Sequence, residues 1–272
     1  MAAILVLVHP SDLFRNRHFM VTGLFDHWIA AGHRVLVHEG TTGLPDADIA
    51  LLHVDTTVVP EAYIEALARY RVVLNGATGD ISKRRISEQL VGPEESYTGP
   101  VIVKTNANAG GVPEWLHQEV ARASGRAMGP AVHPVLARYP VFASNADVPD
   151  AMRRDPDLVV ERFLPERDER GYYARHWIFF GDAERCNRVL GAEPVVKGSD
   201  ILERVAVPVP DELRVWRKRL GFDYGKFDFV IHDGKPVLLD VNRTPAAPAK
   251  LSDALRAGNA ALAEGIASFL KA

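Results

Sequence analysis

The sequence contains a single cysteine, Cys186, among 272 residues. One thiol cannot form an intrachain disulfide or a cysteine-based zinc cluster, which is typical of a protein from a reducing compartment. The formal net charge of −3 lacks the excess of lysine and arginine that binding to a nucleic-acid backbone usually requires. No apolar stretch is long enough to cross a bilayer. We therefore expect a cytoplasmic protein with no nucleic-acid partner and no membrane partner.

The composition and the order of apolar segments indicate a folded α/β protein. Apolar residues make up 47% of the chain and charged residues 25%, which excludes a disordered tail or a collagen. Near the start of the chain, apolar strands alternate with helical segments, which is typical of an open parallel sheet covered on both faces. The expected strands are 3–9, 33–38, 49–54 and 72–75. His9 to Asp12 follow the first strand, where a dinucleotide-binding loop needs glycines, so that kind of site is excluded.

The remainder of the chain predicts two further units, so the whole is α/β with α+β character overall. The second unit opens with a helix over about 78–91, followed by a strand at 101–105 and a helix beginning near Pro113. The third unit alternates strands with a helix at 211–220 and ends in a hairpin and a terminal helix. The expected units are 1–80, 81–157 and 158–272.

The hairpin over residues 225–242 carries the most informative polar residues. Its two strands meet at Asp233-Gly234, and side chains alternate between the two faces of each strand. A two-residue turn at Asp233-Gly234 places Asp228 and Asp240 on opposite faces, which buries one carboxylate among apolar groups at a high cost. A three-residue loop from Asp233 to Lys235 places both on one face. We therefore predict the three-residue loop with a glycine bulge.

Three oxygen-bearing side chains then converge on one face of this hairpin. The two carboxylates of Asp228 and Asp240 and the amide of Asn242 fit a hard cation such as magnesium, with phosphate oxygens and water completing the octahedron. Like charges so close together need a cation between them. Taken alone, the segment is explained equally well by an exposed hairpin with ordinary polar residues on its solvent face.

The segment Lys226 to Pro245, which ends Leu239-Asp240-Val241-Asn242-Arg243-Thr244-Pro245, resembles the closing motif of the ATP-grasp superfamily. That motif is an Asp, a hairpin, an acidic residue, any residue and Asn. The resemblance implies an ATP-grasp fold behind an N-terminal pre-ATP-grasp domain. It also implies that Asp228, Asp240 and Asn242 bind magnesium, or manganese in its place, against the phosphates of ATP. The middle acid is usually Glu, and Asp240 is one methylene shorter.

The resemblance extends upstream and implies roles for further residues. The strand ending at Lys104 is similar to the family's phosphate-binding strand, Asn108 to Gly111 stands at its mobile phosphate loop, and Val159 to Leu164 at the strand that recognises adenine. Glu166 stands where an acidic residue holds the ribose. The residues implied for nucleotide binding are Lys83, Lys104, Gly110, Gly111, Glu161, Arg162, Phe163, Leu164, Glu166 and Lys197. The residues implied for catalysis, through charge on the transferred phosphoryl group, are Lys104, Arg175 and Arg188.

Other conspicuous residues have structural explanations. Ten histidines are scattered without a metal-binding spacing, so we expect surface or capping roles for them. Trp177, Phe179 and Phe180 on one strand are expected in the core, and Cys186 is expected to be a buried, inert thiol. Gly99 to Thr105 superficially resembles a phosphate-binding Walker loop, but Val103 replaces its required glycine.

The resemblance implies a carboxylate–amine ligase similar to ribosomal-protein glutamate ligase and glutathione synthetase-like enzymes. In such a reaction ATP activates a small-molecule or peptide carboxylate as an acyl phosphate, and an amine or other nucleophile displaces the phosphate. Two alternatives stay open: an ATP-grasp kinase that phosphorylates a hydroxyl, and a nucleotide-binding protein without catalysis. A homo-oligomer also stays open. Acceptor contacts are expected from the leading unit and from residues 243–250.

Overall fold

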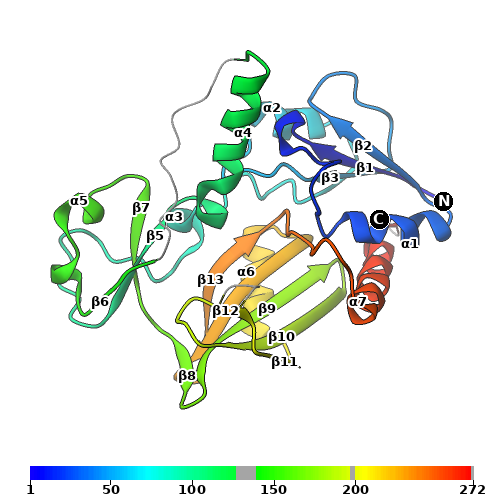
Figure 1. Ribbon diagram of the computed structural model, residues 1–272. Coiled ribbons are helices and arrows are strands. Elements are labelled where there is room, and N and C mark those ends of the chain that lie inside the picture. The colour runs from blue at the N-terminus through cyan, green and yellow to red at the C-terminus, as the bar shows by residue number, and fades with distance from the viewer. Residues whose placement is uncertain (127–138, 197–199, 271–272) are drawn as a thin grey trace.

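Three β-sheets and the helices around them make up the computed structural model, which describes residues 1–126, 139–196 and 200–270 (Figure 1). The strand orders are β2-β1-β3-β4 in the first sheet, β6-β5-β7 in the second and β11-β10-β9-β12-β13 in the third, where β8 also pairs with β9. The first sheet is parallel and the other two are antiparallel. The predicted α/β class with α+β character is confirmed.

The first sheet explains why the opening apolar run is continuous. Its elements are β1 (Ala3–Val8), α1 (Thr22–Ala30), β2 (Arg34–Glu39), β3 (Ile49–Leu52), α2 (Glu61–Leu67) and β4 (Val72–Leu74). Alternate residues of the central strand β1 enter two different cores. Ile4 and Val6 pack with Trp28 of α1, whereas Leu5 and Leu7 pack with residues of α2. A strand buried on both faces has no polar side, so alternation is lost from its sequence.

The second sheet differs from the prediction in two respects. Its elements are α3 (Lys83–Ile86), β5 (Val101–Thr105), α4 (Val112–Ala123), β6 (Val141–Phe142), α5 (Asp150–Arg153) and β7 (Leu158–Arg162). The helix predicted over 78–91 is wrong, because only one turn forms. On either side of that turn the backbone donors have other partners: Ile81 N donates to Thr57 O, and Val91 N donates to Val160 O. The strand β7 pairs with β5 and therefore lies with the central unit, not with the C-terminal one.

The third sheet packs one face against α6 (Asp211–Leu220), while on its other face Ile178, Phe180 and Tyr224 pack against the first unit. Its strands are β8 (Glu166–Asp168), β9 (Gly171–Phe180), β10 (Ala183–Gly191), β11 (Glu203–Ala206), β12 (Tyr224–His232) and β13 (Lys235–Asn242). On the face that α6 covers, Leu213 packs with Trp177, Phe179 and Phe227. The predicted core positions of Trp177, Phe179, Phe180 and Cys186 are confirmed, since all four are buried.

The C-terminal helix returns to the first sheet. The helix α7 (Asp253–Ala263) lies against α1, and α8 (Ala267–Leu270) follows it (Figure 1). The indole nitrogen of Trp28 donates to Ala263 O at 3.0 Å. The helices approach so closely that a Cβ added at Gly23 would lie 2.3 Å from the amide nitrogen of Asn259. Across the three described ranges, no helix is both long and apolar enough to traverse a membrane.

Candidate active site

The turn of the β12–β13 hairpin contains two residues. His232 pairs directly with Lys235, so the predicted three-residue loop is wrong. Asp233 and Gly234 between them have φ angles of 49° and 76°. Two consecutive positive φ angles are the requirement of a type I′ turn, whose twist matches that of the flanking strands, and Asp-Gly is one of its preferred sequences.

A β-bulge in β13 brings the two aspartates opposite each other. Near the turn, Phe229 pairs with Leu238; one step further on, the register shifts and Asp228 pairs with Asp240. Leu239 is therefore the extra residue on its strand. The convergence of the two carboxylates follows from this bulge and not from a longer loop, because one inserted residue anywhere between the paired positions has the same effect on register.

The polar residues of the hairpin share the face opposite α6. Lys226 pairs with Asn242 and Asp228 with Asp240, two residues apart on each strand, so all four side chains project to one side. The intervening pair, Phe227 and Val241, is fully buried in the core beneath α6. The predicted arrangement of Asp228, Asp240 and Asn242 on one face is present.

A lysine from the central unit reaches this face. Lys83 of α3 is buried, and its Nζ lies 2.6 Å from Asp240 Oδ1. Burial lowers the pKa of Lys83, but the charge and hydrogen bond of Asp240 and the charge of Glu161 raise it more, so the pKa lies above its usual value. Lys83 therefore stays protonated and lies within electrostatic range of acidic residues on two different sheets.

The second aspartate has a lysine on its own strand. The Nζ of Lys226 lies 2.8 Å and 2.9 Å from the two carboxylate oxygens of Asp228, and its hydrogen bond goes to Oδ2. The Oδ1 atom is buried and receives no hydrogen bond from the described residues. His176 of β9 lies nearby, with Nε2 3.7 Å from Asp228 Oδ1, and burial lowers its pKa to about 4 although Asp228 opposes this. A metal ion bound at Oδ1 would therefore take the place of the Lys226 ammonium beside it.

Lys104 forms a buried ion pair within the central sheet. Its Nζ on β5 lies 2.6 Å from Glu161 Oε2 on the neighbouring strand β7, and both residues are buried. The other oxygen of Glu161, Oε1, is buried and has no hydrogen-bond partner among the described residues. Buried acceptors are normally satisfied, so this atom is positioned to accept a hydrogen bond from a ligand N–H.

The predicted phosphate loop has an unusual backbone. Ala109, Gly110 and Gly111 have φ angles of 46°, 72° and 80°, a left-handed run that glycine adopts without strain. The helix α4 begins directly after it without a side-chain cap, but Val112 N donates to Ala109 O and Pro113 has no N–H, so a phosphate could approach the glycines more readily than the helix amides. On the first-sheet side, Asn108 N donates to Thr57 Oγ1 at 2.8 Å. This segment fits an anion-binding role, and the assignment of Gly110 and Gly111 stays a prediction.

The hinge after β7 borders a cavity of about 740 Å³, lined in part by Phe163, Leu164, Glu166 and Ile231. Arg162 is exposed and stacks over Tyr97 at 5.3 Å from the ring centroid, and it does not line this cavity. Lys197 lies outside the described residues. The structure thus brings together Phe163, Leu164 and Glu166 of the residues predicted to bind the adenine and the ribose.

Glu166 is held by the two arginines assigned to catalysis. Arg175 donates from Nε and Nη2 to its two carboxylate oxygens at 2.9 Å and 2.8 Å, and Arg188 Nε donates at 2.8 Å. Burial raises the pKa of Glu166, but these bonds and one from Ile231 N lower it more, so the net pKa is below its usual value. The three residues therefore act as one cluster, and the separate roles given to them stay predictions.

A hydrogen-bond chain that the sequence did not reveal connects Asn242 to the first sheet. Thr244 N donates to Asn242 Oδ1 at 2.8 Å, and Thr244 Oγ1 donates to Asp55 Oδ1 at 2.6 Å. Asp55 in turn pairs with Arg17 at 2.6 Å. Fixing the amide of Asn242 in this way orients its oxygen, as supporting residues do around metal ligands. Only the position of Thr244 in the closing motif gave a signal for this chain.

The residue between Asn242 and Thr244 anchors the hairpin in the first unit. Arg243 is 0% exposed, and its guanidinium donates to the carbonyl oxygens of Val54, Thr56, Thr57 and Thr78. Burial lowers its pKa to about 10, with the charges of Asp55 and Glu114 opposing the change. The guanidinium stays charged and ties the end of β13 to the carboxyl edge of the parallel sheet.

Two histidines and an aspartate meet at the same edge of the first sheet. His9, Asp12 and His117 have ligand atoms within 4.8 Å of one another, with His117 Nε2 2.6 Å from the buried Asp12 Oδ1. The histidine rings stack with centroids 4.4 Å apart and planes at 20°, and Ser11 N donates to His9 Nδ1. Nearly parallel rings do not aim both lone pairs at one ion. The cluster therefore joins α4 to the first unit, and its histidines lie 108 residues apart, beyond any spacing rule.

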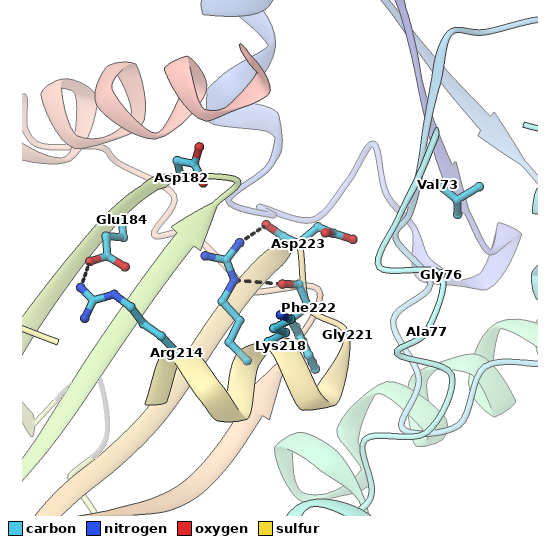
Figure 2. Close-up of a pocket in the computed structure, with 11 residues that line it drawn as sticks. Val73, Gly76, Ala77, Asp182, Glu184, Arg214, Lys218, Gly221, Phe222 and Asp223 are labelled. Atoms are coloured by element: carbon cyan, nitrogen blue, oxygen red, sulfur yellow. Dashed lines mark hydrogen bonds and ion pairs between the residues drawn. The ribbon is translucent and has the colours of Figure 1, made fainter. Parts of the chain in front are cut away.

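A cavity of about 640 Å³ lies beside α6 and is lined in part by Gly76, Ala77, Arg214 and Lys218. Arg217 donates to the carbonyl oxygens of Phe222 and Asp223. Figure 2 shows Arg214 paired with Glu184. None of the predicted site residues lines this cavity. Its wall instead contains the junction between β4 and β12, where Asn75 Oδ1 accepts from Asp223 N at 2.9 Å. The cavity is a feature of that junction.

The fold is similar to solved structures, although no protein-family model and no curated protein matches the sequence. ATP-grasp ligase PsnB, complexed with minimal precursor, is 14% identical with a TM-score of 0.56, and the match covers 99% of each chain. A RimK domain protein ATP-grasp from Sphaerobacter thermophilus is 13% identical with a TM-score of 0.52, over 99% of this chain and 100% of that one. The macrocyclase MdnC from Microcystis aeruginosa, bound with precursor peptide MdnA, is 9% identical with a TM-score of 0.53, over 96% and 99%.

This chain has the ATP-grasp fold. The expectation drawn from the closing motif is therefore confirmed at the level of the fold. In this ATP-grasp chain the third sheet presents Asp228, Asp240 and Asn242, the central sheet presents Lys104 and Glu161, and Lys83 reaches from α3 to the hairpin.

Proposed function

We propose that the protein is an ATP- and magnesium-dependent ligase that activates a carboxylate for attack by an amine or other nucleophile. The observation that carries the proposal is the position of Lys83. Its ammonium pairs with Asp240 on the hairpin, and the charge of Glu161 on the central sheet also raises its pKa. Residues from both ATP-grasp sheets therefore face one space, which a bound nucleotide requires.

The donors on the hairpin suit magnesium or manganese. Two carboxylates and an amide oxygen are hard ligands, and Asp228 Oδ1 is buried without a hydrogen bond from the described residues. Each carboxylate has a lysine beside it, so the like charges of Asp228 and Asp240 are balanced in the absence of an ion. Bound there, magnesium would supply positive charge to the phosphate oxygens of ATP.

The central sheet and hinge suit the nucleotide itself. The free Oε1 of Glu161 can accept from the adenine amino group, and the hinge cavity beside Phe163 and Leu164 offers an apolar wall. Lys104 and Lys83 offer ammonium groups to phosphate oxygens in place of their present carboxylate partners. Gly110 and Gly111 let the backbone approach a phosphate.

In the proposed reaction a substrate carboxylate oxygen bonds to the γ-phosphorus of ATP, and the bond to ADP breaks. An amine nitrogen then bonds to the acyl carbon, inorganic phosphate leaves, and the amine loses a proton. The protein's contribution is to position the reactants and stabilise charge through Lys83, Lys104 and the Arg175–Arg188 cluster, and no side chain needs to act as a nucleophile.

Peptides are included among the acceptors to be tested. Of the proteins with the same fold, PsnB is complexed with a minimal precursor and MdnC is bound with the precursor peptide MdnA. We therefore propose to measure ADP release with amino acids, small dicarboxylic acids and peptides as substrates. Wild-type protein is compared with Asp240→Ala and with Asp240→Asn, and Asp253→Asn at the exposed start of α7, outside the hinge cavity, is the matched control.

A substrate-dependent release of ADP that the Asp240 variants lose and Asp253→Asn keeps supports the proposal. Full activity of Asp240→Ala would contradict the proposal. The products separate the alternatives, because a ligase yields an amide or ester together with phosphate, whereas a kinase yields a stable phosphorylated alcohol. Magnesium-dependent ATP binding without ADP release in any mixture indicates a nucleotide-binding protein without catalysis.

A further inference from the structure

A second cavity, of about 550 Å³, lies beside the loop that follows β1 and is lined in part by Phe14, Arg15, Arg17, His18 and Phe25. This volume is in the range of small-molecule and short-peptide sites. Phe14 is buried in the core of the first unit, whereas Phe25 is only partly buried and offers an aromatic surface. Nothing in the nucleotide site described above uses this cavity.

The lining of this cavity has charge of one sign. Arg15, Arg17 and His18 contribute basic groups, and no acidic residue lines it among the described residues. Arg15 is exposed and makes no ion pair within the described part of the chain. Arg17 uses Nη1 for Asp55 and for Asp12 O, while its other N–H groups have no partner among the described residues. The cavity therefore offers donors and positive charge beside aromatic rings.

The cavity is coupled to the predicted metal ligands. Arg17 pairs with Asp55, which accepts from Thr244, and Thr244 N donates to Asn242. The backbone provides a second connection, because Met20 N donates to Pro245 O and Ala247 N donates to His18 O, both at 2.8 Å. The loop that carries the basic residues is thus fixed to the segment directly after the metal motif.

We propose that this cavity binds a carboxylate of the acceptor substrate, other than the one being activated, together with an adjoining aromatic or apolar group. The proposal rests on the proposed ligase function and adds a substrate class to it, namely acidic peptides or similar amphipathic dicarboxylates. Guanidinium groups recognise carboxylates through paired charge-assisted hydrogen bonds, and the apolar part packs on Phe25. Arg17 then contacts the acceptor and also belongs to the hydrogen-bond chain that orients Asn242.

Binding of three capped dipeptides tests this proposal by isothermal titration calorimetry, with magnesium and a non-hydrolysable ATP analogue present. N-acetyl-Phe-Glu-amide carries only a side-chain carboxylate, N-acetyl-Phe-Gln carries only a C-terminal carboxylate, and N-acetyl-Phe-Gln-amide carries neither. Wild-type protein is compared with Arg15→Glu and Arg15→Gln. Arg34→Glu, an exposed arginine on β2 outside the cavity lining, controls for net charge.

We expect at least one acid to bind about 10- to 100-fold more tightly than the neutral peptide, as the loss of a charge-assisted hydrogen bond implies. Both Arg15 variants should lose that preference, and Arg34→Glu should keep it. The tighter of the two acids identifies the source of the carboxylate. Equal binding of the neutral peptide, equal binding by Arg15→Glu, or no binding of either acid at concentrations up to about 10 mM overturns the proposal.

The ATP analogue is titrated separately into each variant. Analogue binding that survives in Arg15→Glu, together with lost peptide preference, places the effect in the acceptor cavity. Failure of the analogue to bind wild-type protein is instead a failure of the proposed function. Circular dichroism confirms that the exposed substitution leaves the fold intact.

Discussion

At the scale of single residues, the candidate site is held together by ion pairs that a ligand must replace. Lys83 is paired with Asp240, Lys226 with Asp228, and Lys104 with Glu161. Each pair satisfies a charge that the buried or half-buried surroundings would otherwise penalise. Cation and nucleotide binding are therefore exchanges of partners, and a substitution in one member changes how its partner binds ligands.

Lys83→Met is expected to raise affinity for a divalent cation in the absence of nucleotide while weakening ATP binding. Removing the ammonium 2.6 Å from Asp240 removes repulsion against the incoming ion, by about tenfold in affinity, and also removes a phosphate partner. Titration with manganese, followed by electron paramagnetic resonance, measures the first effect, and calorimetry with ATP the second. Lys83→Arg keeps the positive charge and should change neither the affinity for manganese nor the affinity for ATP. Weaker manganese binding by Lys83→Met contradicts this account.

His53 predicts how stability depends on pH. It is fully buried between Phe14 and Phe19, both ring nitrogens lack partners among the described residues, and burial lowers its pKa to about 4 despite the opposing charge of Asp12. Between about pH 6.5 and 4, the unfolded chain binds a proton that the folded chain does not. Stability is therefore full above this window and falls as pH falls through it, by about 2 kcal/mol between pH 7 and pH 5.

His53→Leu should remove that part of the pH dependence. Urea unfolding at pH 7 and pH 5 measures it, as the difference between variant and wild type at each pH. The exposed His27→Gln on α1 serves as control. An identical loss of stability in wild type and His53→Leu on going to pH 5 would show that another group dominates.

At the scale of elements, the hairpin shows what the sequence could and could not predict. Alternation along Lys226, Asp228, Asp240 and Asn242 correctly predicted that their side chains share a face, because burying a carboxylate among apolar residues is costly. It did not locate the inserted residue, since a bulge at Leu239 and a longer loop satisfy the same pattern. The turn residues themselves favoured the two-residue form.

Elsewhere, tertiary contacts decided what local sequence could not. Residues 78–91 have a helical pattern, yet only Lys83–Ile86 is helical because the flanking backbone bonds to neighbouring segments. The lysines and acidic residues of the candidate site were predicted from the closing motif and from the order of the segments that precede it in the sequence. Arg17, Asp55 and the His9–His117 pair lie far apart in sequence, so only the folded chain reveals that they belong together.

Gly234→Ala is expected to destabilise the hairpin by about 1 to 2 kcal/mol. The reason is backbone conformation, since Gly234 has φ of 76° and a Cβ there would meet nothing within 4 Å. Thermal unfolding measures the loss, which should appear as a lower midpoint. Asp233→Gly, at φ of 49°, should be tolerated in the same assay. No change in Gly234→Ala would mean that the turn readjusts.

At the scale of the whole molecule, a single side chain joins the C-terminal hairpin to the first sheet. Arg243→Met removes every hydrogen bond from its guanidinium to the four carbonyl oxygens and leaves them buried. We expect a loss of at least about 3 kcal/mol in urea unfolding, because buried acceptors without partners are costly. Arg214→Met should lose less than about 1 kcal/mol, because Arg214 is exposed and pairs with the exposed Glu184 and Asp211 and with the Val209 carbonyl oxygen. Similar losses in the two variants would contradict the anchoring role.

The docking of α7 on α1 has a consequence for biosynthesis. The indole of Trp28 donates a hydrogen bond to Ala263 O. The core beneath α1 includes Leu262 and Ile266 as well as residues of β1. The ribosome synthesises α1, which ends at Ala30, more than two hundred residues before that cover, and the sheet is complete at Leu74, also long before it. The nascent first unit therefore has an incomplete hydrophobic layer until α7 is synthesised, a state that favours chaperone binding and proteolysis.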